Sequence, residues 1–218
     1  MTTSAGGSRA PLTDPTESRG TPPAHSLGAH IRATGVLMVL AILLTGFAYP
    51  LFVTGIAQVM DPGAANGSLI RYPNGTIEGS QLVAQNLSQP YLFWERPSMT
   101  DYNILNGAGT PPGPTDPALQ QLINETLNYS RAYGVFTVTA SVPLWYLAPS
   151  ASGVDPDLVP EAVLIQIPRV ANATNLSIAN LTNLVNAHIT QPVLPDLGVP
   201  YVNVLLLDIS LCQMTGRW

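Results

Sequence analysis

The stretch ATGVLMVLAILLTGFAYPLFVTGIAQVM, residues 33–60, decides how the chain is organised, because it carries no charged side chain over 28 residues. An apolar helix needs about 20 residues to cross the hydrocarbon core of a bilayer. A longer apolar helix fits by tilting, and Pro50 is expected to distort it. We therefore interpret residues 33–60 as one transmembrane helix.

Two other interpretations fit this stretch less well. A cleaved signal peptide has an apolar region of about 7 to 15 residues behind a short basic head. The present stretch is longer, follows 32 residues and precedes no A-x-A-like site. A buried helix of a soluble domain usually shows a polar face, which residues 33–60 lack. A retained membrane anchor is favoured.

The charges before the span set its expected orientation. Arg9, Arg19 and Arg32 precede it, and Arg32 stands at its edge. Basic residues near a span favour the cytoplasmic side, so the N-terminus is expected in the cytoplasm. Residues 1–32, rich in Ser, Thr, Gly and Pro, read as a disordered cytoplasmic tail. Residues 61–218 are then extracytoplasmic, and the chain is a single-pass protein of the cell membrane in contact with lipid.

One face of the span is expected to pack against another membrane protein. Small residues let transmembrane helices approach closely, and residues spaced by four and three share a helix face. In the span, five residues recur at alternating steps of four and three, and four of them are small. These predicted packing residues are Ala41, Thr45, Ala48, Phe52 and Gly55.

Residues 61–218 are long enough for one domain with a hydrophobic core. Runs rich in β-branched residues predict strands, and apolar residues with helical spacing predict helices. The expected elements are strands at 68–72, 135–142 and 201–211, and helices at 117–133, 160–168 and 176–188. The helix at 117–133 is expected to bury Leu119, Leu122, Ile123 and Leu127. The fold class is thus an α/β or α+β extracytoplasmic domain after one N-terminal transmembrane helix.

The composition of this domain excludes several classes of function. The chain has no lysine, and after residue 60 it carries 11 acidic and 5 basic residues. Nucleic-acid binding needs clustered cations, so no nucleic acid is expected as a partner. Cys212 is the one cysteine, which allows neither an intramolecular disulfide nor a cysteine-based metal site.

Sequons of the form Asn-x-Ser/Thr, which accept N-glycans in proteins that cross a glycosylating membrane, are frequent. Eight occur, where about 2 are expected by chance, and all follow the span. The glycosylation candidates are Asn66, Asn74, Asn86, Asn124, Asn128, Asn172, Asn175 and Asn180.

Catalytic motifs are lacking. The chain has no GxxxxGK[ST], GxSxG or HExxH motif, and its three histidines are divided between the tail, with His25 and His30, and the predicted helix that holds His188. The stretch SASGVDP, residues 150–156, places serines near Asp155 without a basic partner. A turn with Gly153 at positive φ and Asp155 capping the backbone is the better interpretation. We expect no catalytic residues, no metal site and no intrinsic cofactor.

Ordered blocks of sequence nevertheless match a known family. The blocks include TGFAYPL at 45–51, ANGSLI at 65–70, RPS at 96–98, SASGVDP at 150–156, RVA at 169–171 and VNVL at 202–205. In their order and spacing, from about residue 45 to 211, they resemble the C subunit of the Kdp potassium-transporting P-type ATPase.

The resemblance implies an accessory, non-catalytic subunit of a high-affinity potassium importer. Its partners would be a channel-like subunit and an ATP-hydrolysing subunit, so that ATP and potassium belong to the complex. The family description implies a role in assembly and a catalytic chaperone activity that raises the ATP affinity of the hydrolysing subunit. An alternative is a stand-alone surface glycoprotein that binds a ligand or a cell-wall component.

The resemblance also implies a nucleotide contact at Gln85, the Gln of a Gly-Gln pair in the family. In this chain Ala84 precedes it. The expected orientation places Gln85 outside the cell whereas ATP is inside, and one helix cannot bring them together. A scaffolding mechanism, in which the span packs on a partner and the acidic domain lies over the outer entrance, fits the residues better.

Overall fold

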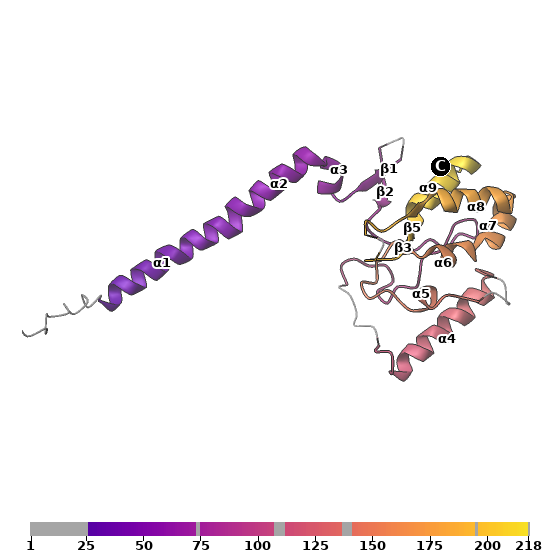
Figure 1. Cartoon of the computed structure of the whole chain (residues 1–218), viewed down its shortest axis with the longest axis horizontal. Helices are drawn as coiled ribbons and strands as arrows, with labels where there is room; N and C mark the ends of the chain where they lie inside the picture. Colours follow the sequence, from indigo (N-terminus) through magenta and orange to yellow (C-terminus); the bar gives the residue numbers. More distant parts are fainter. Residues whose placement is uncertain (1–25, 73–74, 107–111, 137–140, 195, 218) are drawn as a thin grey trace, which may run out of the picture. The chain divides into compact units, whose positions relative to one another are not determined.

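The computed structural model describes residues 26–72, 75–106, 112–136, 141–194 and 196–217. They form two compact units, one ending at Ile56 and the other beginning at Ala57. The first unit is helical, and the second mixes helices with two small sheets (Figure 1). The expected fold class, one N-terminal apolar helix followed by a mixed helix and sheet domain, is confirmed.

The apolar helix runs from Leu27 to Met60 as α1 (Leu27–Leu43), a π-helical turn η1 (Leu44–Ala48) and α2 (Tyr49–Met60). Within the described part of the chain, it is the one helix long and apolar enough to cross a membrane. It begins before residue 33, so residues 27–32, expected in the tail, are helical. Residues 1–25 of that tail lie outside the described residues.

The local departure from α geometry lies at η1, just before Pro50. Proline has no N–H to donate, so the α pattern of bonds cannot continue unbroken there. The Tyr49 N–H donates to the Leu44 carbonyl, five residues back, and the Thr45 hydroxyl donates to the Ala41 carbonyl at 2.7 Å. This wider turn rotates the residues after it relative to those before it.

After the span, a short helix and a hairpin lead into the domain. The Asp61 carboxylate caps α3 (Pro62–Ala65) by accepting from the Ala64 N–H at 2.9 Å. Strands β1 (Leu69–Arg71) and β2 (Ile77–Ser80) pair antiparallel, which confirms the strand predicted at 68–72.

The second sheet has the order β3-β5-β4, all antiparallel. Its strands are β3 (Asp157–Leu158), β4 (Ile189–Thr190) and β5 (Tyr201–Asn203). Helices α6 (Pro160–Leu164), α7 (Ile167–Thr174), α8 (Ile178–Ala187) and α9 (Val204–Thr215) surround it. The fully buried centre of the core is formed by Val163, Val170, Leu181, Val185, Val202 and Leu207.

The remaining helices are α4 (Pro117–Ala132) and the single turn α5 (Leu144–Leu147). The Asp116 carboxylate caps α4, and Pro117 occupies its first turn as predicted. The helices predicted at 117–133 and 176–188 are confirmed, but Leu119, Leu122, Ile123 and Leu127, predicted to be buried, are only partly buried. The helix predicted to begin at Pro160 and to be interrupted by Pro168 is confirmed, because α6 ends at Leu164 and Pro168 lies in the first turn of α7.

The strand predicted at 201–211 is wrong beyond its first three residues. β5 ends at Asn203, whose side chain accepts from the Leu206 N–H at 3.1 Å and so caps α9. An apolar run that is buried on all sides has the same sequence pattern whether it forms a strand or a core helix. Of the strand predicted at 135–142, residues 137–140 lie outside the described residues, and 135, 136, 141 and 142 are not in a strand.

Candidate functional site

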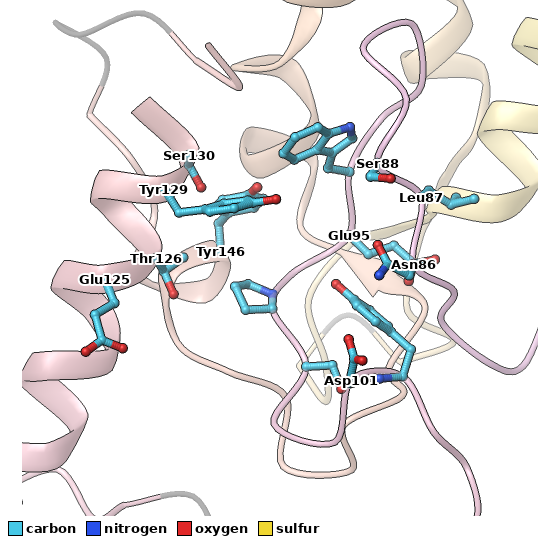
Figure 2. Close-up of a pocket in the computed structure, with 14 residues that line it drawn as sticks. Asn86, Leu87, Ser88, Glu95, Asp101, Glu125, Thr126, Tyr129, Ser130 and Tyr146 are labelled. Atoms are coloured by element: carbon cyan, nitrogen blue, oxygen red, sulfur yellow. Dashed lines mark hydrogen bonds between the residues drawn. The ribbon is translucent and has the colours of Figure 1, made fainter. Parts of the chain in front are cut away.

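A cavity of about 440 Å³ lies beside helix α4 and is called the α4 cavity below. One wall is α4 itself, with Tyr129, and Tyr146 of α5 lies beside it. The other wall is irregular chain, residues 86–88 and 94–102 (Figure 2). The cavity therefore lies between helix α4 and a wall of irregular chain, and that wall must be held in place by contacts with other elements.

Buried side chains from distant elements hold that irregular wall. The Phe93 N–H donates to Asp208 of α9 at 2.8 Å, and the Trp94 N–H donates to Gln166 at 2.8 Å. The Gln166 amide returns a bond to the Trp94 carbonyl at 2.9 Å. A buried backbone outside a sheet needs such partners, because an unsatisfied buried amide is costly.

Arg169 completes this support from the core side. Its guanidinium lies 5.0 Å above the centre of the Trp94 ring, and it donates to the Pro90 carbonyl at 2.6 Å and to Gln166 at 2.9 Å. Burial lowers the pKa of Arg169 to about 10. Trp94 is thereby fixed between Arg169 and Tyr129, whose ring centre is 6.2 Å away.

Glu95 is the buried acid of the cavity lining, with 5% of its surface exposed. Its Oε2 accepts from the Gln85 N–H at 2.8 Å, whereas Oε1 has no hydrogen-bond partner. Burial, opposed by the hydrogen bond from the Gln85 N–H and reinforced by the nearby Asp155 and Asp157, raises the pKa of Glu95 to about 8. Near neutral pH the Glu95 carboxyl is therefore mostly protonated in the folded domain.

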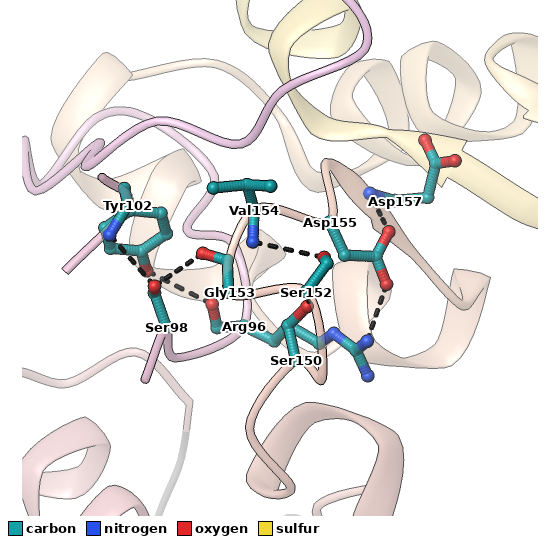
Figure 3. A network of polar contacts seen from close by, with 9 residues as sticks. All are labelled: Arg96, Ser98, Tyr102, Ser150, Ser152, Gly153, Val154, Asp155 and Asp157. Atoms are coloured by element: carbon teal, nitrogen blue, oxygen red, sulfur yellow. Dashed lines mark hydrogen bonds and ion pairs between the residues drawn. The ribbon is translucent and has the colours of Figure 1, made fainter. Parts of the chain in front are cut away.

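Residues 150–156 form a structural turn that supports the same wall (Figure 3). Asp155 pairs with Arg96 at 2.6 Å, and the Ser98 hydroxyl donates to the Gly153 carbonyl. Gly153 has φ +73°, a conformation that favours glycine, and Asp155 accepts from the Asp157 N–H at 3.2 Å. The predicted turn with Gly153 at positive φ and a backbone cap from Asp155 is confirmed.

The aromatic residue next to this turn is Tyr102. Its hydroxyl donates to the Arg96 carbonyl at 3.1 Å, and its N–H donates to the Ser98 hydroxyl at 2.9 Å. Burial and the neighbouring Glu95 raise the pKa of Tyr102, so the phenol stays protonated. Tyr102 therefore presents a neutral ring and hydroxyl to the cavity.

Gln85 lies next to the cavity and is not among its lining residues. Its side-chain amide packs so closely against Gly79 of β2 that an added Cβ there would collide with it. The Gln85 Nε2 atom is buried and has no hydrogen-bond partner. The cavity lining also contains no Arg, and the chain has no Lys, so the lining offers no cation for a triphosphate.

The other predicted site residues are placed as follows. Seven of the sequon asparagines are exposed, and Asn74 lies outside the described residues.

In the span, Ala41 precedes η1, Thr45 and Ala48 lie within it, and Phe52 and Gly55 follow it. The wider turn interrupts the four-and-three spacing, so the packing face remains a prediction. Within the described part of the chain, no group of three or more His, Cys, Asp or Glu residues could hold a metal ion.

Local sequence patterns did not single out Glu95, Asp208 or Gln166 as supports of this site. Gln166 and Asp208 are single polar residues between apolar neighbours, and Glu95 stands between Trp94 and Arg96, so none of the three carries a periodic signal. Their partners are 10, 115 and 72 residues away along the chain, respectively.

Comparisons with known proteins agree with the family resemblance. The family model described as "K+-transporting ATPase, c chain" matches residues 31–213. A potassium-transporting ATPase KdpC subunit of Geobacter sulfurreducens is 40% identical over 179 residues, covering 81% of this chain and 93% of that protein. The KdpC subunit of Methanosphaerula palustris is 40% identical over 186 residues, covering 85% of this chain and 98% of that protein. The KdpC subunit of Sorangium cellulosum is 41% identical over 186 residues, covering 84% of this chain and 97% of that protein.

Proposed function

Because the chain belongs to the KdpC family, the c chain of K⁺-transporting ATPases, we propose that it is a non-catalytic accessory subunit of a high-affinity potassium import complex. In this role it supports assembly of the complex and acts as a catalytic chaperone that raises the ATP affinity of the ATP-hydrolysing subunit. The family match over residues 31–213 is the observation that carries the proposal. Potassium and ATP are then handled by the complex, and this chain has no intrinsic cofactor.

The proposed topology places the N-terminus in the cytoplasm and the second unit outside. Arg32 marks the cytoplasmic side of the apolar segment, and the stretch from Ala33 to Met60 carries no charge. The outer domain, with 11 acidic and 5 basic residues, would lie over the entrance used by K⁺. Its negative field would raise the local cation concentration within a Debye length of about 8 Å.

In the membrane, the apolar helix is proposed to dock on the channel-like subunit or on the ATP-hydrolysing subunit. In the first unit, no residue in the most apolar window of the helix is buried, and a Cβ at Gly55 would meet nothing within 4 Å. Close helix contact at such positions is a common way for transmembrane helices to associate. The turn η1 divides the packing face into a part at Ala41 and Thr45 and a part at Phe52 and Gly55.

Cysteine cross-linking tests this docking. Thr45→Cys and Gly55→Cys, each in a Cys212→Ser background, are expected to give cross-links to another subunit of the purified complex. Leu43→Cys and Val53→Cys are matched controls, because residues two positions apart on a helix face different directions. No product from either test position in an intact complex would reject the docking face, and equal products from the controls would reject its specificity.

The effect on ATP affinity is proposed to be transmitted through the membrane helix and the partner subunits, without contact between Gln85 and nucleotide. The close packing of Gln85 on Gly79 and the lack of a cation in the cavity lining support this view. Gln85→Ala is expected to leave the KM for ATP of the assembled complex within about twofold. Loss of ATP affinity by tenfold or more (about 1.4 kcal/mol), with assembly intact, would instead establish a direct role for Gln85.

A further inference from the structure

We propose that the α4 cavity is a binding site for a small organic ammonium ion. Three features carry this inference: the size of the cavity, the aromatic faces of its walls, and a set of acidic side chains with no basic residue among them. The inference goes beyond the proposed role in potassium import and does not depend on it.

The size of the cavity suits a small organic molecule. Ligand sites commonly enclose about 300 to 1,000 Å³, and this cavity has about 440 Å³. A single potassium ion would fill only a small part of that volume. An alkylammonium ion can place its charged head on one side of the cavity and its carbon atoms against the other.

The aromatic walls suit the charge of such an ion. Figure 2 shows Tyr129 and Tyr146 together on the side of α4, with Glu95 and Asp101 across the cavity. The face of a tyrosine ring carries negative potential, and ammonium groups are attracted to it when they lie within about 6 Å of the ring centre. A lining that combines tyrosine rings with acids favours a ligand that is both apolar and cationic.

The acids provide the charge complement. Glu95, Asp101 and Glu125 all line the cavity, although Glu125 accepts a bond from Gln121 at 2.8 Å and so is engaged on the rim. Glu95 is the inner acid: only 5% of its surface is exposed and its Oε1 has no partner. A buried carboxyl oxygen without a partner is costly, and an N⁺–H donor from a ligand would satisfy it.

The same acid makes binding sensitive to pH. The titratable groups that face Glu95 are Asp155, Asp157, Asp208 and Tyr102, none of which is a cation. Burial raises the pKa of Glu95 to about 8, so a cation that binds near pH 7 must displace a proton from it. Binding is therefore expected to release a proton below pH 8 and to strengthen as the pH rises toward 8.

The test is calorimetric titration of the full chain in detergent with n-butylammonium chloride, at a constant total salt concentration. n-Butanol, which has nearly the same shape and no charge, is the matched ligand control. We expect saturable binding of butylammonium, and binding of butanol that is weaker by tenfold or more (about 1.4 kcal/mol). Comparison of buffers with different ionisation heats should show uptake of protons by the buffer near pH 7 and none at pH 9.5.

Two variants assign the binding to the cavity. Glu95→Gln should weaken butylammonium binding about tenfold and abolish the proton release, because a charge-assisted bond is lost. Tyr129→Leu should weaken binding without abolishing the proton release, and Glu161→Gln, at an exposed position in α6, should change neither. The proposal is overturned if butylammonium does not bind, if butanol binds equally well, or if the folded Glu95→Gln variant binds butylammonium as tightly as the unchanged chain.

Discussion

Replacing Gln166 with leucine is expected to lower the free energy of unfolding of the domain that follows the apolar helix by about 3 to 5 kcal/mol. The side chain is fully buried and bonds both the N–H and the carbonyl of Trp94, at 2.8 and 2.9 Å. Leucine has similar volume and no polar atoms, so both backbone groups would be buried without partners. Arg169, which donates to Gln166 at 2.9 Å, would also lose an acceptor.

This loss can be measured by urea unfolding of the full chain in detergent, followed by tryptophan fluorescence. All three tryptophans follow the apolar helix, so the signal reports on the domain after that helix. Gln213→Leu, at an exposed position of α9, is the matched control and should change stability by no more than about 0.5 kcal/mol. A Gln166→Leu domain as stable as this control would show that the amide contacts do not support the wall of the α4 cavity.

The second large effect is a loss of stability as the pH rises from about 4.5 to 8, and Glu95→Gln should remove the part of it that comes from Glu95. In the folded domain burial raises the pKa of Glu95 from 4.5 to about 8, so the folded state holds a proton that the unfolded state releases. The stabilisation from that proton is complete below pH 4.5 and is lost as the pH rises to about 8. The total change is on the order of 5 kcal/mol, since one unit of pKa corresponds to about 1.4 kcal/mol.

Glutamine cannot ionise, and its amide keeps the acceptor for the Gln85 N–H, which is 2.8 Å from Glu95 in the unchanged chain. The variant should therefore match the unchanged chain near pH 5 and be more stable at pH 9. Unfolding by urea at a series of pH values measures the difference. A parallel decline of both proteins between pH 5 and 9 would mean that Glu95 is not the acid responsible.

The features that sequence patterns predicted are those encoded by neighbouring residues. The span needs only length and absence of charge, the start of the helix at Pro117 is local, and Gly153 fits the turn at 150–156 by its own conformational freedom. The amphipathic helix α8 shows its period directly in the sequence. Each of these signals lies within one element of the chain.

The features that were missed depend on contacts between distant parts of the chain. β5 and α9 share one apolar run, so only the cap at Asn203 marks the change from strand to helix. The wall of the α4 cavity depends on Gln166 and Asp208, which reach Phe93 and Trp94 from elements far along the chain. No periodicity specifies such pairs, and the raised pKa of Glu95 exists only once these elements bury it.

Copurification tests the central proposal, that this chain works as a subunit of a potassium-importing complex. The tagged full chain is purified in mild detergent from cells that express it together with the genes for its partner subunits. We expect two larger multi-span proteins in a constant ratio with it, and ATP hydrolysis stimulated by K⁺ in the eluate. Recovery of this chain alone, under conditions in which the two larger proteins remain bound to each other and active, would contradict the proposal.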